Sequence, residues 1–449
     1  MSESEAARAG AQALYEAGDL RGALREYQRL LDRWPCDAEL LSDAGAVCFA
    51  LGRTRQGARY FAKALEVDPE HAEARENLSA VCQAMGWDAR AFHSPACEVA
   101  APGGRGRPEV SVVVPVHSRL DVVARCLDAL AAQTLPMRAY EVLAVANGVR
   151  GQAMSDLRAL LAEHGKRFGE RLRLVEVEQA SIPLARNAGI EAAAGRIVLQ
   201  MNEDTILPPR ALERHHAAHE GFGFSPECVV IGGRQFPEPY RKSLFNYLYE
   251  SVPLYTPLHR PAPSRRCTGR WFVTCNLSCL REAYARFGVY DPAYDWGSDT
   301  ALGLRWEREH GLSFYLRTDI VSYHLHWLSF DSWRENCIRR VPTALRLATG
   351  LSPDELPPEV HARVVDNLEL FRMDMAAFEA EMRRIERDFT GPDDFGPDTF
   401  MGETVRDIEE FDERLRPVIA NYKQRLHLTE LRELLKRKRK WQPEGRVRA

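Results

Sequence analysis

The feature that most limits the possible folds is an alternation of apolar strand-like segments with amphipathic helical segments, which begins at residue 109. The first strand-like segment, EVSVVVPV, is apolar and β-branched almost throughout, as is typical of a parallel strand buried on both faces. This alternation predicts an α/β fold with a mostly parallel, doubly wound sheet, whose ligand crevice lies at the carboxyl ends of the strands. The four expected strands are residues 109–116, 140–147, 172–178 and 196–202.

A chain of 449 residues is too long for one hydrophobic core, so two or three domains are expected. The composition of residues 93–108, HSPACEVAAPGGRGRP, predicts a linker. We therefore expect an all-α module over 1–92, a catalytic domain over 109–348 and a helical extension over 349–449. In the extension, two helical segments are expected, over 357–389 and over 407–440, the second broken at Pro417.

The first 90 residues contain a repeat with a period of 34, marked by Gly18, Gly52 and Gly86. Tyr27 and Phe61 recur at the same spacing, as expected for aromatic side chains that fill the space between paired helices. The segments GDLRGALREYQRLLDRWP and GRTRQGARYFAKALEVDP resemble tetratricopeptide repeats. Such an array is either a docking surface for a protein partner or a cap on the next domain.

Charge and cysteine content limit the environment of the protein. The formal net charge of −4 gives no general attraction to nucleic acid, and we expect no nucleic-acid partner. The basic run at 436–440 is either a solvated helix end or a patch for a partner or lipid headgroups. The aromatic stretch 244–261 favours a packed helix followed by a loop over stacking on a sugar acceptor or peripheral membrane contact. No secretory signal is visible, and none of the ten cysteines forms a C-x-x-C pair, which predicts a cytoplasmic protein with reduced thiols. Cys275 and Cys279, four residues apart, suit one face of a helix or opposite ends of a turn.

Polar residues follow the expected strands. They are His117 to Arg119 after the first strand, Asn147 and Gly148 at the second, and Asn202, Glu203 and Asp204 at the fourth. An acidic pair at such a strand end is where an open α/β sheet holds a metal ion and a phosphorylated ligand. In contrast, the helical HHAAH motif with His215 and His219 lacks a further metal-ligating residue at a suitable spacing, so we expect an exposed helix there.

Residues 109 to about 340 resemble the family 2 glycosyltransferases, which are inverting nucleotide-sugar enzymes of the GT-A fold. Five motifs carry the resemblance in the order of the family, whereas the repeats and the C-terminal helices lie outside it. The motifs are VSVVVPVHSR, EVLAVANG, PLARNAGIEAAAGRIVLQMNEDTILPP, TCNLSCLREAYARFGVYDPAYDWGSDTALGLR and VSYHLH.

The resemblance implies a divalent metal ion, Mn²⁺ or Mg²⁺, which stabilises the leaving diphosphate. The Asp-x-Asp motif of the family is Asn202-Glu203-Asp204 here, which places the metal-binding carboxylate on Asp204. Asn202 brings no charge, so metal binding is expected to be weakened. The late histidine of the family matches His324 or His326; both lie on one face of a strand, and we favour His324.

The same resemblance assigns the other site residues. Asp299, at the start of a helix, matches the general base that takes the proton of the acceptor hydroxyl. Ser298 replaces the usual Glu and also suits a helix N-cap; with Trp296 it is assigned to the acceptor side. The residues assigned to the nucleotide sugar are Pro115, His117, Arg119, Asn147, Arg186, Asn187, Asn202 and Glu203.

The predicted function is metal-dependent transfer of a sugar from a UDP-linked donor to a glycan, lipid-linked or protein acceptor. The alternative is a catalytically inactive scaffold or nucleotide-sugar sensor that acts through the repeats, because Ala146, Asn202 and Ser298 depart from the family pattern.

Overall fold

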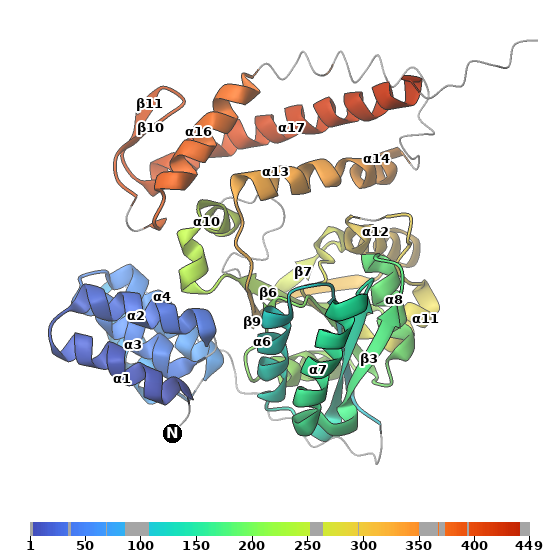
Figure 1. Cartoon of the computed structure of the whole chain (residues 1–449), viewed down its shortest axis with the longest axis horizontal. Helices are drawn as coiled ribbons and strands as arrows, with labels where there is room; N and C mark the ends of the chain where they lie inside the picture. Colours follow the sequence, from blue (N-terminus) through green and yellow to red (C-terminus); the bar gives the residue numbers. More distant parts are fainter. Residues whose placement is uncertain are drawn as a thin grey trace, which may run out of the picture. The chain divides into compact units, whose positions relative to one another are not determined.

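A nine-stranded sheet is the centre of residues 107–326. The chain is described by a computed structural model, which covers residues 3–34, 37–68, 70–85, 107–251, 264–294, 296–349, 367, 373–392 and 395–440 (Figure 1). These residues divide into two compact units. The first contains the described residues of Met1–Tyr240, Leu258–Pro292 and Leu302–His326, and the second those of Arg241–Pro257, Ala293–Ala301 and Trp327–Ala449.

The strands follow the order β3-β2-β1-β4-β8-β6-β9-β5, and β7 pairs with β9. The four strands expected from the sequence are confirmed, with ends within one residue of the expectation, and they pair in parallel. β8 is antiparallel to both β4 and β6, so the sheet is mixed, with most strands in one direction. The strands are β1 (Val110–Val116), β2 (Tyr140–Asn147), β3 (Leu172–Val177), β4 (Ile197–Met201), β5 (Thr205–Ile206), β6 (Cys228–Gln235), β7 (Arg265–Cys267), β8 (Asn276–Leu280) and β9 (Ser313–His324).

Helices cover both faces of this sheet, which explains why β1 is apolar along its whole length. Val112 and Val114 belong to the core that includes α6 (Leu120–Ala131) and α7 (Gly151–Phe168). Val113 belongs to the opposite core, which includes α8 (Ile182–Ala192). The expected doubly wound α/β architecture is thereby confirmed. Further helices of this region are α9 (Ala211–Gly221), α11 (Arg281–Phe287) and α12 (Ser298–His310), with 3₁₀ turns η2 (Met137–Ala139), η3 (Gly169–Arg171), η4 (Glu238–Lys242) and η6 (Gly269–Trp271).

The N-terminal residues form five helices in which each packs against the next. Tyr27 and Phe61, which occupy equivalent repeat positions, are both buried. Gly18 and Gly52 adopt the same left-handed backbone, with φ of 79° and 75°, so the turn between paired helices recurs with the sequence. Assignment to tetratricopeptide repeats remains a prediction; Gly86 lies outside the described residues. The helices are α1 (Glu3–Glu16), α2 (Leu20–Arg33), α3 (Ala38–Ala50), α4 (Thr54–Val67) and α5 (Ala72–Met85).

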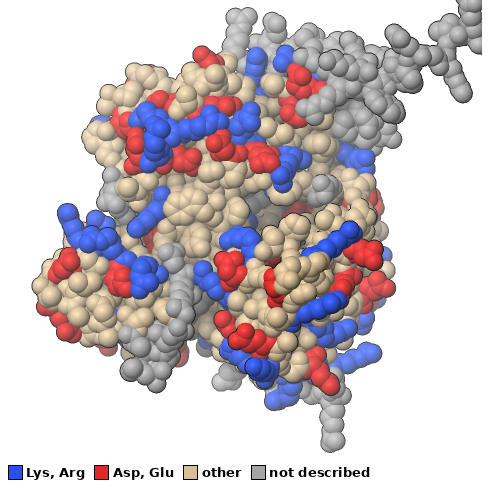
Figure 2. All heavy atoms as spheres, in the orientation of Figure 1, with Lys and Arg blue, Asp and Glu red and all other residues tan. Residues whose placement is uncertain are grey.

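The second unit is mostly helical and has an aromatic core. Tyr422 stacks on Trp333 and contacts Phe378, while Phe245 contacts Trp333. Figure 2 shows acidic and basic side chains interspersed over this unit, in agreement with its many ion pairs, such as Arg383 with Asp331. Its elements are α10 (Leu244–Ser251), α13 (Phe330–Arg339), α14 (Val341–Thr349), α16 (Met375–Asp388), β10 (Asp398–Phe400), β11 (Glu403–Val405) and α17 (Ile408–Lys440).

Two expectations about local structure are wrong. α17 continues through Pro417 without a break, because Leu415 and Ile419 on either side are buried and tertiary packing outweighs the lost hydrogen bond. Cys275 and Cys279 share neither a helix face nor the two ends of one turn: Cys275 lies in the turn that directly precedes β8, and Cys279 lies within β8, both buried. The described cysteines form no disulfide with one another. The helix expected over 357–389 is described only at residue 367 and over residues 373–389, which contain α16.

No described helix is both long enough and apolar enough to cross a bilayer.

Candidate functional site

The polar segments that follow β1, β2 and β4 meet at the carboxyl edge of the sheet. The backbone N–H of His117 donates to Oε2 of Glu203 at 2.7 Å, and Nδ1 of His117 lies 3.1 Å from the carbonyl oxygen of Asn147. Pro115 is buried in β1 opposite Val145 of β2. Thus the structure brings together three of the strand ends that the sequence assigned to one ligand site.

Asp204 occupies the centre of this edge, in a tight connection that returns the chain as β5. Its Oδ1 lies 3.0 Å from Nε2 of His324, and its Oδ2 lies 3.8 Å from Nδ1 of His326. Nη1 of Arg119 lies 3.5 Å from Oδ2, and Nη2 of the same guanidinium donates to the carbonyl oxygen of Leu325. The predicted carboxylate and both predicted histidines are therefore neighbours, although some 120 residues separate them in the sequence.

The electrostatic surroundings keep Asp204 ionised. Burial alone would raise the pKa of this carboxyl, but His324, His326 and Arg119 outweigh burial and lower the pKa to about 2. Burial lowers the pKa of His326 to about 4, with the charge of His324 acting in the same direction. Burial also raises the pKa of Glu203. At neutral pH the group therefore contains one firmly anionic carboxylate and a neutral His326.

Asp204 and His324 have the donor atoms of a divalent-cation site. Nδ1 of His324 is buried and has no hydrogen-bond partner among the described residues. Oδ1 of Asp204, 3.0 Å from Nε2 of His324, keeps a second lone pair, so both side chains have unused capacity. Carboxylate oxygen and imidazole nitrogen are both ligands of first-row divalent ions. Within the described residues, no group of three or more His, Cys, Asp or Glu is arranged to hold a metal ion. The protein residues fit a cation whose coordination is completed by other ligands.

Arg186 from α8 reaches the same edge and engages Asn202. Its Nη2 donates to Oδ1 of Asn202 at 2.9 Å, and its Nη1 donates to Oε1 of Gln200 at the same distance. A third, longer bond goes to the carbonyl oxygen of Thr274. The guanidinium is buried, and among the described residues all these partners are neutral. A buried cation without a carboxylate partner is suited to an anionic ligand.

Asn147 is held in one orientation at the end of β2. Its Oδ1 accepts a hydrogen bond from the backbone N–H of Ser181 at 2.7 Å, so Nδ2 is the group left for a ligand. The next residue, Gly148, has φ of 70°, and a Cβ there would lie 2.6 Å from the Cβ of Ala180. In contrast, Asn187 is fully engaged elsewhere: it exchanges two hydrogen bonds with the backbone of Tyr290.

Trp296, Ser298 and Asp299 belong to the second unit. Ser298 is not the N-cap that its type suggested, because it is the first residue of α12 and Gly297 precedes the helix with φ of 89°. Oδ1 of Asp299 accepts from the backbone N–H of Thr300 at 2.7 Å. The ring of Trp296 lies beneath the guanidinium of Arg339. The catalytic and acceptor roles of these residues remain predictions.

The expectation of an exposed helix at His215 and His219 is wrong. Both side chains are fully buried against β8, where Nε2 of His219 lies 2.9 Å from Oγ of Ser278 and Nδ1 of His215 lies 2.8 Å from the same oxygen. Nε2 of His215 lies 2.8 Å from Oδ1 of Asn276. One neutral tautomer of each histidine satisfies all three contacts, with the Ser278 hydroxyl donating to His215. This polar cluster is structural and bridges α9 and β8.

Sequence reasoning also missed Gln200, which orients Arg186 from inside the fourth strand. The only signal was a polar residue in the otherwise apolar segment RIVLQMN.

Comparison with known proteins identifies the domain that contains this edge. Residues 111–272 match the family model "Glycosyl transferase family 2". Glycosyltransferase AglE of Haloferax volcanii is 31% identical over 29% of this chain and 41% of its own length. Validoxylamine A glucosyltransferase of Streptomyces hygroscopicus subsp. jinggangensis is 25% identical over 53% of this chain and 62% of its own length. The chain thus spans less than two thirds of these relatives.

Among solved structures, the mannosyltransferase PcManGT from Pyrobaculum calidifontis, in complex with GDP-Man and Mn²⁺, has a TM-score of 0.42 and 18% identity; the match covers 86% of this chain and 100% of that chain. The family match and the curated relatives lead to one conclusion: the chain contains a glycosyltransferase domain of family 2.

Proposed function

We propose that this protein transfers a sugar, with inversion, from a UDP-linked donor to a hydroxyl group of a glycan, lipid-linked or protein acceptor. The observation that carries the proposal is the ionised Asp204 beside His324, which lies at the same sheet edge as His117 and Asn147. This edge is where α/β sheets bind nucleotides, and His117, Asn147 and Asp204 lie within the residues that match the family 2 model.

The residues around Asp204 suit the parts of such a donor. The free Nδ2 of Asn147 is a donor for a carbonyl oxygen of the base, and uracil has two such oxygens. The buried guanidinium of Arg186 is suited to the diphosphate, because its present partners are neutral. Arg119, which contacts Asp204 and donates to the carbonyl oxygen of Leu325, is a second cation at this edge.

Asp204 and His324 would hold a divalent ion, Mn²⁺ or Mg²⁺, and Asn202 contributes little because Arg186 already occupies its oxygen. When bound, such an ion stabilises negative charge on the leaving diphosphate. Asp299 is the proposed general base, and Trp296 and Ser298 the proposed acceptor contacts. The N-terminal helices are proposed to dock a protein partner, and the basic end of α17 to contact a membrane surface; we place the protein in the cytoplasm.

The test is a panel of nucleotide sugars incubated with the full chain, with and without Mn²⁺, in which release of nucleoside diphosphate is measured. Asp204→Asn should abolish metal-dependent release, whereas Asp128→Asn, an exposed carboxylate on α6, should leave release unchanged. Asp299→Asn should retain UDP binding but lose transfer. If the Asp204 variant releases diphosphate as fast as the unmodified protein, the proposed site is wrong. Preference for a GDP-linked donor would contradict only the assignment of uracil as the nucleobase of the donor.

One observation favours a second candidate, a nucleotide-sugar sensor without turnover: the usual first carboxylate of the motif is Asn202, whose oxygen accepts from Arg186. A sensor would bind UDP-sugars in a calorimeter and release no diphosphate in the presence of any acceptor. Metal-dependent release that depends on Asp204 excludes it.

A further inference from the structure

A pocket of about 370 Å³ lies at the edge of the sheet opposite to the proposed donor site. Its lining includes Glu109, which directly precedes β1, and Arg196, which directly precedes β4. β1 has seven residues, so its length separates this pocket from His117 by roughly 20–25 Å. The two ligand sites would therefore be distinct.

The backbone around the pocket is fixed by the sheet. The N–H of Ile197 donates to the carbonyl oxygen of Glu109 at 2.8 Å, and the N–H of Arg281 donates to that of Arg196 at 2.8 Å. These bonds join the beginnings of β1 and β4 to the beginning of α11. The side chains that line the pocket therefore project from a rigid base, as a specific binding site requires.

The lining is rich in arginine and poor in compensating charge. Arg107, Arg196 and Arg281 all line it. Within the described part of the chain, neither Arg107 nor Arg281 has an ion-pair partner, and Glu282 already pairs with Arg286. Glu109 is the remaining carboxylate of the lining, so the pocket carries an excess of about two positive charges.

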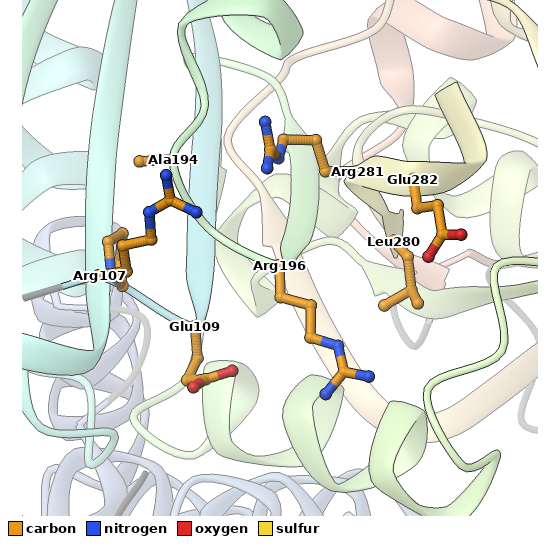
Figure 3. A pocket seen from close by; sticks show the side chains of 8 residues that line it. Arg107, Glu109, Ala194, Arg196, Leu280, Arg281 and Glu282 are labelled. Carbon is orange, nitrogen blue, oxygen red and sulfur yellow. The ribbon is translucent and has the colours of Figure 1, made fainter. Parts of the chain in front are cut away.

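The arginines divide into two kinds. Arg196 is held in place by Phe224, because its guanidinium carbon lies 3.8 Å from the centre of that ring. Figure 3 shows the guanidinium groups of Arg107 and Arg281 turned toward one another across the pocket, whereas Arg196 extends in another direction. Arg107 and Arg281 are the groups available to a ligand, and Arg196 adds charge.

The size and the other walls indicate what kind of anion fits. Pro108, Ala194 and Leu280 provide apolar surface beside the arginines. A volume of about 370 Å³ falls in the range of roughly 300–1,000 Å³ that is common for small organic ligands, and exceeds the needs of a bare oxyanion. A phosphate monoester carries a charge of about −1.5 to −2 near neutral pH, which matches the excess of positive charge.

We infer that this pocket binds the phosphate group of a small phosphorylated organic molecule, with Arg107 and Arg281 as its anion contacts. Guanidinium groups bind phosphate through paired N–H donors, and two such groups facing each other can engage one dianion from both sides. The inference is independent of the sugar donor and of Asp204.

The inference is tested by isothermal titration calorimetry on the full chain at constant ionic strength, with inorganic phosphate and glucose 6-phosphate as probes. We expect saturable binding of both, tighter for glucose 6-phosphate because its organic part fills space that inorganic phosphate leaves empty. The double variant Arg107→Gln/Arg281→Gln should weaken binding at least tenfold. Arg308→Gln, which removes one exposed arginine of α12 outside the lining, should leave binding unchanged.

Arg281→Lys separates a built site from general charge attraction, because lysine keeps the charge but loses the paired donors. We expect its affinity to lie between that of the unmodified protein and that of the double variant. Equal affinity in the lysine variant and the unmodified protein would overturn the assigned contacts. Absence of saturable binding, or equal binding by the double variant and the Arg308 variant, would overturn the site itself.

Discussion

Substitution of Asn202 by aspartate tests what the amide in the metal motif does. The Asp-x-Asp pattern alone suggests that Asn202→Asp restores a metal ligand and tightens Mn²⁺ binding. In the structure, however, Oδ1 of Asn202 accepts from Arg186 at 2.9 Å. The new carboxylate would have the same size as the amide, and it would place its charge beside a buried guanidinium whose partners among the described residues are neutral.

The expected gain follows from this geometry. Two unit charges about 4 Å apart attract by about 4 kcal/mol at an effective dielectric constant of about 20. Desolvation of the partly buried carboxylate and loss of the present charge–dipole bond cancel much of this attraction. We expect a net increase of about 1–2 kcal/mol in the free energy of unfolding. Because Arg186 draws the carboxylate, Mn²⁺ affinity should change by less than about tenfold.

The assay combines urea unfolding of the full chain with calorimetric titration of Mn²⁺. The matched control is Asn187→Asp, in the neighbouring position of α8. There Nδ2 donates to the carbonyl oxygen of Tyr290 at 2.8 Å, so a carboxylate would face another oxygen and lower stability by about 1–3 kcal/mol. Opposite signs for the two variants support the reasoning. Unchanged or lower stability of Asn202→Asp, or Mn²⁺ affinity raised far beyond tenfold, would refute it.

Three further predictions concern the scaffold. Gly189→Ala should lower the free energy of unfolding by about 1–3 kcal/mol in urea titrations, because its Cβ would lie 2.3 Å from Cγ1 of Val113; no loss would mean that the helix shifts freely. Gly148→Ala should weaken UDP binding at least tenfold, since this residue has φ of 70° beside Asn147; wild-type affinity in calorimetry would contradict a rigid loop. Burial lowers the pKa of His215 to about 4 and that of His219 to about 3, against about 6.5 when unfolded. As pH falls, the unfolded chain therefore binds protons before the folded chain does, and the free energy of unfolding should drop by up to about 3 kcal/mol per histidine between pH 6.5 and 4. The drop should be smaller in His219→Gln; a drop equal to that of the unmodified protein would exclude His219 as its cause.

The sequence predicted the parallel half of the sheet well because its evidence is local. The segments 109–116 and 140–147 are apolar on both faces, and only a strand covered by helices on both sides accommodates such a pattern. The gathering of polar residues at one edge follows directly, since parallel strands end together. The local pattern is therefore sufficient to place Asp204, His117 and Asn147 at the same edge.

What the sequence could not supply depends on contacts between distant segments. His215 and His219 are buried because Ser278 and Asn276, some 60 residues later, provide matched polar partners on β8. The bond between Arg186 and Asn202 requires the relative position of α8 and β4, which no local pattern contains. Similarly, α17 is continuous through a proline because packing of its neighbours outweighs a local preference.

The neutral surroundings of Arg186 also have a consequence for the lifetime of the protein. A domain that buries a cation among amides and a carbonyl is less stable when empty than when an anion occupies the edge beside that cation. Ligand binding and folding are then linked, because every bound diphosphate withdraws molecules from the unfolding equilibrium. Protein molecules without a bound nucleotide sugar would unfold first and be degraded first. If the proposed function holds, the amount of this protein in a cell would follow the supply of the nucleotide sugar that it uses.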